Sequence, residues 1–248
     1  QNRERLFLVA INEKYGNARF NYPAPTHGPG AENPYVTVAD AILDLPQIDS
    51  GEETEVYDFD INTVTNPTRL EFLKIMRGIS KPAPAHLNYN PGTISSHKAV
   101  NHKESMRMRM SLIKQGENMQ SACERLKENN QNELIEKYFP KKLYAARNRR
   151  LKEDEPSFTV TSHCLDEMIH PRLNRALTPR EVARLQSFPD WYIFMGPYVK
   201  FHSDPQQDRY EQIGDAIPPL LAYNIAKEIV KTLNSIFPDR AIQDEGVV

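Results

Sequence analysis

The clearest structural signal of the chain is the stretch Thr178-Pro179-Arg180-Glu181-Val182-Ala183-Arg184-Leu185-Gln186-Ser187-Phe188-Pro189-Asp190. Thr178 is a good helix cap, Pro179 suits the first turn, and Glu181 stands where a capping box needs a carboxylate. Val182, Leu185 and Phe188 follow at helical spacing, and Phe188-Pro189-Asp190 is typical of a helix end. The stretch therefore predicts a short amphipathic helix with strongly fixed ends.

Further helices are expected on both sides of this stretch. Towards the C-terminus, Gln212 to Pro219 indicates a turn in which Gly214 permits the backbone bend. Pro218-Pro219 then starts a helix with an apolar stripe made of Ala222, Ile225, Ala226, Ile229, Val230 and Leu233. Towards the N-terminus, helical composition or spacing predicts helices over residues 37–45, 66–77, 98–115 and 119–137.

Near the start of the chain, Leu6-Phe7-Leu8-Val9-Ala10-Ile11 forms a continuous apolar run. The run is short for a helix and does not alternate, so it predicts a strand that is buried on both faces. Such a strand needs a neighbour on each side, yet the rest of the chain offers few comparable strands. We therefore expect this chain to be part of a larger fold.

Composition excludes several classes of protein. The 248 residues are 39% hydrophobic and 26% charged, which suits one large or two modest globular domains. No apolar run approaches the roughly 18 residues of a transmembrane helix, and no signal peptide follows the charged N-terminus. Cys123 and Cys164 form no CxxC motif, so a disulfide scaffold or zinc finger is not expected, and an intracellular, reducing compartment fits.

Charge is unevenly distributed although the whole chain carries only −2. Residues 97–152 hold 14 Lys or Arg against 6 Asp or Glu, whereas residues 44–60 hold seven acids and no base. A basic block inside an acidic chain indicates a face that binds a polyanion. A solvated helical surface with paired charges explains the same block, and the charges alone do not decide between the two.

Two smaller patterns need no ligand. His97 and His102 are five residues apart, which places them poorly for one helical face, so no metal site is predicted. Met106, Met108 and Met110 alternate with arginines, a pattern that suits a strand or the edge of a core.

Three segments, taken in order, resemble motifs VIII, IX and X of the C5 cytosine DNA methyltransferases. They are Gln1-Asn2-Arg3-Glu4-Arg5 with its apolar run, the stretch Arg175–Asp190, and Gln212-Ile213-Gly214-Asp215-Ala216-Ile217-Pro218-Pro219. Weaker similarities lie between them, around Pro25-Thr26-His27 and Pro156–Thr161. The resemblance covers nearly the whole chain, and three motifs in the family's order are far more specific than one.

Several hallmarks of that family are missing. Its nucleophile is a cysteine in a Pro-Cys loop, but Cys123 and Cys164 follow alanine and histidine. Its Glu-Asn-Val motif is absent, and no glycine-rich turn follows a strand to hold the cofactor. The chain thus resembles the C-terminal half of such an enzyme, from motif VIII onwards.

The resemblance implies roles for residues at the two ends of the chain. Arg3 and Arg5 would face the catalytic pocket, where their guanidinium groups stabilise the reacting base, although exposed strand-end arginines are the alternative. Asp215, Ala216 and Ile217 would lie against S-adenosylmethionine, whose site the missing half mostly supplies. Asp215 stands where most members carry Asn, so a contact that needs an amide NH2 would be lost.

The resemblance also implies that double-stranded DNA with a flipped cytosine is the substrate. The predicted DNA contacts are Arg107, Arg109, Arg147, Arg149, Thr159, Thr161 and His163. For the charged residues of the 175–190 stretch, we favour Arg–acid pairs that fix the helix over direct contact with DNA.

The implied fold class is α/β. Residues 1–14 would supply a strand to a methyltransferase sheet completed by the missing N-terminal half. Residues 15–174 would form a small, mixed, loop-rich target recognition domain. Residues 175–248 would return to the catalytic domain with the motif IX helix, motif X and a last helix.

The function implied is the target-recognition and domain-completing part of a DNA (cytosine-5-)-methyltransferase of a restriction-modification system. It needs a chain or segment that carries motifs I to VII, and the isolated chain would be inactive. We expect it in the bacterial cytoplasm, or in the nucleus of a eukaryote, with no membrane partner. The alternatives are a stand-alone, non-catalytic DNA-binding module and a degenerate, inactive fragment.

Overall fold

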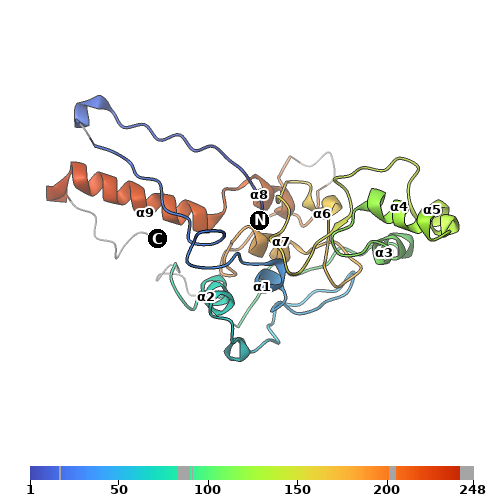
Figure 1. The fold of residues 1–248 in the computed structure, drawn as a ribbon. Coiled ribbons are helices and arrows are strands. Elements are labelled where there is room, and N and C mark those ends of the chain that lie inside the picture. The colour runs from blue at the N-terminus through green and yellow to red at the C-terminus, as the bar shows by residue number, and fades with distance from the viewer. Residues whose placement is uncertain (17, 83–89, 91, 201–204, 241–248) are drawn as a thin grey trace.

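The computed structural model describes residues 1–16, 18–82, 90, 92–200 and 205–240 (Figure 1). The helices of these residues are α1 (Val38–Ile42), α2 (Pro67–Met76), α3 (Glu104–Ser111), α4 (Met119–Glu128), α5 (Asn132–Tyr138), α6 (Cys164–Glu167), α7 (Pro179–Leu185), α8 (Arg209–Asp215) and α9 (Pro219–Ile236). Short 3-10 turns occur at Glu13–Tyr15, Ile61–Thr63 and Pro238–Arg240, and the strands are β1 (Arg149–Arg150) and β2 (Met168–Ile169).

The central body of the molecule packs α1, α2, α7 and α8 around one hydrophobic core. Every residue of α7 is buried, and its capping box between Thr178 and Glu181 is formed as the sequence predicts. The helix ends at Leu185, earlier than Phe188, because Ser187 takes a positive φ of 63° and the Phe188 amide turns back to donate to the carbonyl of Ala183. The predicted helices at 37–45 and 66–77 are confirmed as α1 and α2.

A second, smaller core holds α3, α4 and α5 together as a separate helical lobe (Figure 1). The helix expected over 119–137 is interrupted, since Asn130 adopts a left-handed φ of 59° between α4 and α5. The strand-like interpretation of Met106, Met108 and Met110 was wrong, because all three lie on α3. Met110 is buried in the lobe core, with Met106 one turn earlier packed against it.

The α/β prediction is met only in part, because the described residues are mostly helical with one small parallel sheet. In that sheet β1 and β2 pair in parallel, with Arg149 opposite Met168 and Arg150 opposite Ile169. The run Leu6–Ile11 forms no strand, and Leu6 and Leu8 are 84% and 87% exposed. The physical reason is that the described chain offers it no strand to pair with on either side.

The N-terminal segment 6–15 and α9 extend together from the body (Figure 1). A shallow groove of about 370 Å³ runs between them, lined on one side by Val9 and Ile11 and on the other by Ile229 and Leu233. Thr232 is the one described α9 residue that is buried, so the predicted apolar stripe remains largely accessible to solvent.

Candidate functional site

A cleft of about 670 Å³ brings the two ends of the chain together. Arg3 and Arg5 line one side, and Asp215, Ala216 and Ile217 line the other. These are the residues for which the sequence predicted catalytic support and cofactor contact, so the structure places both groups around one space.

Arg3 lies half-buried between the backbone of Val160 and α8. Its Nη1 donates to the carbonyl oxygens of Val160 at 3.2 Å and Gly214 at 3.0 Å. Burial and the nearby Arg5 lower the pKa of Arg3, while Asp215 opposes that shift. Among the described residues, its buried Nε has no hydrogen-bond partner. Arg3 therefore ties two segments together and keeps unused hydrogen-bonding capacity beside the cleft.

Arg5 is the more available of the two arginines. Its side chain is exposed, and its Nη1 donates to the backbone carbonyl of Glu4 at 2.6 Å. No carboxylate of the described residues lies within ion-pair distance of it. The guanidinium can thus accept an anionic or carbonyl-bearing group that enters the cleft.

The opposite wall is built at the end of α8. Asp215 accepts a hydrogen bond from Gln207 Nε2 at 2.9 Å, and Ile217 leaves 55% of its surface exposed. The prediction that Gly214 forms a turn was wrong, because this residue lies within α8. An added Cβ there would come within 2.3 Å of the Ser162 amide nitrogen, so glycine allows two backbones to approach.

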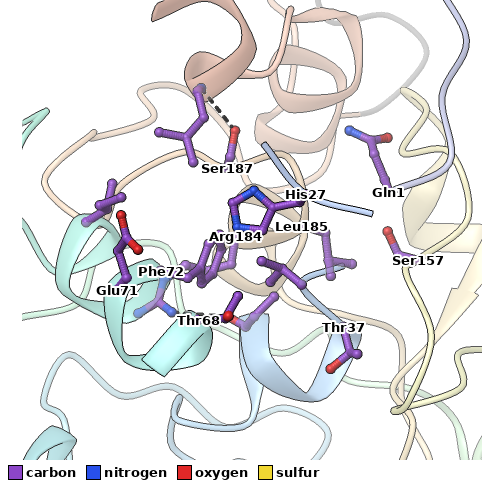
Figure 2. A pocket seen from close by; sticks show the side chains of 14 residues that line it. Gln1, His27, Thr37, Thr68, Glu71, Phe72, Ser157, Arg184, Leu185 and Ser187 are labelled. Carbon is purple, nitrogen blue, oxygen red and sulfur yellow. Dashed lines mark hydrogen bonds between the residues drawn. The ribbon is translucent and has the colours of Figure 1, made fainter. Parts of the chain in front are cut away.

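A second pocket of about 210 Å³ lies beside the cleft and shares Gln1 and Leu185 with it (Figure 2). His27, Thr37 and Glu71 are among its polar lining residues. Figure 2 also shows Ser187 accepting a hydrogen bond at the start of α9, from the Leu220 amide at 3.2 Å.

The charged residues of α7 form a buried network rather than a free surface. Arg184 donates to Asp190 at 2.5 and 2.7 Å and to Asp44 at 3.0 Å, with all three side chains buried. Arg175 pairs in bidentate fashion with Glu181 at 2.7 and 2.8 Å. The interpretation as Arg–acid pairs that fix the helix is confirmed.

One glutamine links this network to the cleft. Gln186 is fully buried, accepts a hydrogen bond from Gln1 and donates to the carbonyl oxygen of Ile213 at 2.9 Å. Gln1 in turn accepts from the Val160 amide at 2.8 Å. The sequence predicts no such role for Gln186, and only its position inside the 175–190 stretch signals it.

The predicted DNA contacts fall into separate places. Arg109 and Arg147 line one pocket at the helical lobe. Arg149 and Thr161 meet at Glu167, with distances of 3.7 and 2.9 Å, and the exposed His163 is nearby in sequence. The remaining two lie apart from both sets, since Arg107 pairs with Asp49 and Thr159 donates to the carbonyl of Asn2.

Neither cysteine is placed for nucleophilic chemistry. Cys123 and Cys164 are both buried, and burial raises the pKa of each thiol. Within the described residues, no group of three or more His, Cys, Asp or Glu could hold a metal. His97 instead bonds Thr178 and the carbonyl of Pro46, each at 2.9 Å, and His102 accepts from the Ala176 amide.

The sequence matches the family model described as C-5 cytosine-specific DNA methylase over residues 1–231. The chain belongs to this family. Type II methyltransferase M.DdeI of Desulfomicrobium norvegicum is 30% identical over 230 residues, which are 92% of this chain and 50% of that protein. Type II methyltransferase M1.HphI of Haemophilus parahaemolyticus is 29% identical, covering 92% of this chain and 44% of its own length.

This C-5 methylase family member thus spans about half the length of the curated relatives that it matches over most of its sequence. Type II methyltransferase M.AquIB of Picosynechococcus differs, because 103 residues at 37% identity make up 73% of it. A crystal structure assigned as a DNA modification methyltransferase encoded within a prophage (E. coli) shares the fold with a TM-score of 0.52 and 22% identity. That match covers 82% of this chain and 49% of the other.

None of the helices in the part of the chain described here is long and apolar enough to cross a bilayer.

Proposed function

We propose that this chain is the target-recognition and domain-completing part of a DNA (cytosine-5-)-methyltransferase. It works with a segment or partner chain that carries motifs I to VII and the catalytic cysteine. The observation that carries this proposal is the cleft in which Arg3 and Arg5 face Asp215, Ala216 and Ile217.

The need for a second half rests on chemistry that this chain lacks. Attack on cytosine requires an accessible thiolate, but both cysteines are buried with raised pKa values. The sequence has no Pro-Cys loop and no Glu-Asn-Val motif. The arginines can stabilise charge on a base, but they cannot supply the nucleophile.

Exposed apolar surface supports the same proposal. Leu6 and Leu8 on the N-terminal segment, Ile217 beside the cleft, and Ile229 on α9 all remain exposed. Large apolar side chains gathered near one end of a soluble domain are typical of a surface that is covered in the assembled protein. This favours the methyltransferase half over a stand-alone DNA-binding module.

S-adenosylmethionine is the cofactor of the family, and the residues present fit one wall of such a site. Ile217 offers an exposed apolar face, and Asp215 offers a carboxylate beside it. The cofactor, when bound, supplies the methyl group that is transferred. Most of its contacts would come from the complementary half.

Native mass spectrometry of the protein purified from its source tests the split. We expect a second chain, or a longer polypeptide, that holds a nucleotide-binding domain and a Pro-Cys loop. A lone species of 28.5 kDa that binds DNA and never methylates it would instead identify a stand-alone binding module.

Arg5→Ala in the complete assembly tests the cleft. The side chain is exposed and its one hydrogen bond is to its neighbour's backbone, so the fold should tolerate the change. Methyl transfer should fall on the order of 100-fold, the loss typical of removing one preorganised donor, while DNA affinity changes little. Arg5→Lys should recover part of the activity, and equal losses of binding and transfer would exclude the pocket role.

A further inference from the structure

A pocket of about 210 Å³ opens on the helical lobe, away from the cleft. It lies between α3 and the segment 140–148, which follows α5. Three cationic side chains line it, namely Arg109, Lys142 and Arg147, together with one acid, Asp166. The pocket is therefore a positively charged recess in an otherwise acidic molecule.

Arg109 forms the inner wall and has no counter-ion. Its Nε donates to the carbonyl oxygen of Tyr138 at 2.6 Å, and its Nη1 contacts the sulfur of Met106 at 3.5 Å. No carboxylate among the described residues lies within ion-pair distance, and burial lowers its pKa. A half-buried guanidinium with these neutral neighbours is poorly compensated, and an anion would compensate it.

Arg150 shows how this protein compensates a buried guanidinium charge at another position. Arg150 is also buried without a carboxylate, but its three nitrogens donate to four backbone carbonyls and to the side chain of Asn174. Among the described residues Arg109 has a single oxygen acceptor, so its remaining N–H groups are available to a ligand in the pocket.

Tyr144 holds the two outer cations. Tyr144 is 45% exposed, with Lys142 Nζ at 5.1 Å and the Arg147 guanidinium carbon at 5.4 Å from its ring centroid. Both distances are within the range of cation–π attraction. The ring thus restrains two long side chains at the pocket mouth, which lowers the entropy that they lose when an anion binds.

We propose that this pocket is a phosphate subsite for the DNA backbone, with Arg109, Lys142 and Arg147 as ligands and Tyr144 as the residue that positions the last two. Asp166 weakens the subsite, because its carboxylate lies 3.8 Å from Arg147 Nη2. The inference rests on the proposed function, since it assumes that the chain binds DNA. It assigns to the helical lobe the task of fixing the duplex in register, because phosphate contacts position a protein on DNA.

The test measures binding of the full chain to mixed-sequence duplex DNA over a series of salt concentrations. Arg147→Ala and Lys142→Ala should each weaken binding about tenfold. Each should also reduce the slope of log affinity against log salt by about 0.9, the value for one lost phosphate contact. Lys127→Ala is the matched control, because Lys127 is exposed on the same lobe but does not line the pocket.

Two further variants separate binding from folding. Tyr144→Ala should weaken binding, whereas Tyr144→Phe keeps the ring and should bind like the wild-type chain. Asp166→Asn should tighten binding, an outcome that damage to the fold would not produce.

Each outcome decides something different. Salt slopes for Arg147→Ala and Lys142→Ala equal to that of Lys127→Ala would overturn the subsite but leave the proposed function intact. No DNA binding by the wild-type chain at low salt would overturn both. Displacement of DNA by inorganic phosphate, beyond the effect of chloride at equal ionic strength and lost in Arg147→Ala, would support a pocket that DNA phosphates occupy. Binding of inorganic phosphate that leaves DNA affinity unchanged would show that the pocket takes free phosphate, not DNA, and would overturn the subsite.

Discussion

His170 is among the most deeply buried ionisable residues of the protein. Its Nδ1 accepts hydrogen bonds from the amides of Arg172 and Leu173, at 3.1 and 3.0 Å, so the ring is held neutral. Its Nε2 lies 3.8 Å from Glu181, which is itself paired with Arg175. A second proton would have to displace the two amide donors inside a region that excludes water.

This arrangement predicts that stability depends on pH. Burial lowers the pKa of His170 from 6.5 to about 4, so between these values the unfolded chain takes up a proton that the folded chain refuses. The free energy of unfolding should therefore fall by about 1 kcal/mol per unit as pH drops from 6.5 to 4. Urea denaturation at several pH values measures this.

The matched variants for that experiment are His170→Asn and His163→Asn. Asparagine can accept the same two amide hydrogen bonds but does not titrate, so His170→Asn should reduce the slope in this window. The slope that remains comes from His97 and His102, because burial lowers their pKa values too. His163 is exposed, and its replacement should leave the slope unchanged. Glu181 acts at lower pH, because Arg175 outweighs burial and holds its pKa at about 2. A slope in His170→Asn equal to that of the wild-type chain would assign the proton uptake to other groups.

At the scale of elements, the position of α8 decides whether the cleft exists. The helix begins with a capping box at Asp208 and ends where Gly214 meets the backbone of residues 161 and 162. Arg3 donates to the carbonyl of the same glycine, so α8, residues 160–162 and the N-terminal residues meet at one point. The cleft wall at Asp215 to Ile217 follows directly from it.

Gly214→Ala should therefore separate α8 from residues 161 and 162. The new Cβ would lie 2.3 Å from two backbone atoms, which cannot move aside as a flexible side chain would. Overpacking of this kind costs about 1–3 kcal/mol of unfolding free energy, and urea denaturation reports it. Gly92→Ala is the control, since its Cβ would approach only the side chain of Asn90 at 3.3 Å. Equal midpoints for the two variants would show that the close approach is not needed.

At the scale of the whole molecule, the sequence predicts helix starts better than helix ends or long-range contacts. The Thr178–Glu181 capping box and the proline starts of α2 and α9 are encoded within a few residues, so these helix starts could be predicted. Asn130 and Ser187 end helices by adopting positive φ, for which their sequence context gives little warning. The cleft was anticipated only through the resemblance, because residues 3 and 215 meet through tertiary packing.

The run Leu6–Ile11 shows most clearly why the rest could not be predicted. Its apolar pattern is that of a buried strand, yet Leu6 and Leu8 stand in solvent. A strand is defined by its neighbours, and the described residues do not contain them. The pattern thus describes the assembled protein that we propose, and the isolated chain shows the same residues without their partners.

We therefore expect substitutions in this run to have little effect on the isolated chain and a large effect on the complete methyltransferase. In the isolated chain, Leu6→Ser with Leu8→Ser should leave the free energy of unfolding within error and lower the binding of an apolar dye such as ANS. Leu45→Ser is the control, since Leu45 is 2% exposed in the core and its loss should destabilise the chain.

In the complete methyltransferase, we propose that the run is covered. Each buried leucine contributes about 1.5–3 kcal/mol, so the double variant should weaken association of the halves by more than tenfold. Should the double variant destabilise the isolated chain as much as Leu45→Ser does, the run would belong to this chain's own core, and the argument for a missing sheet would lose its main support.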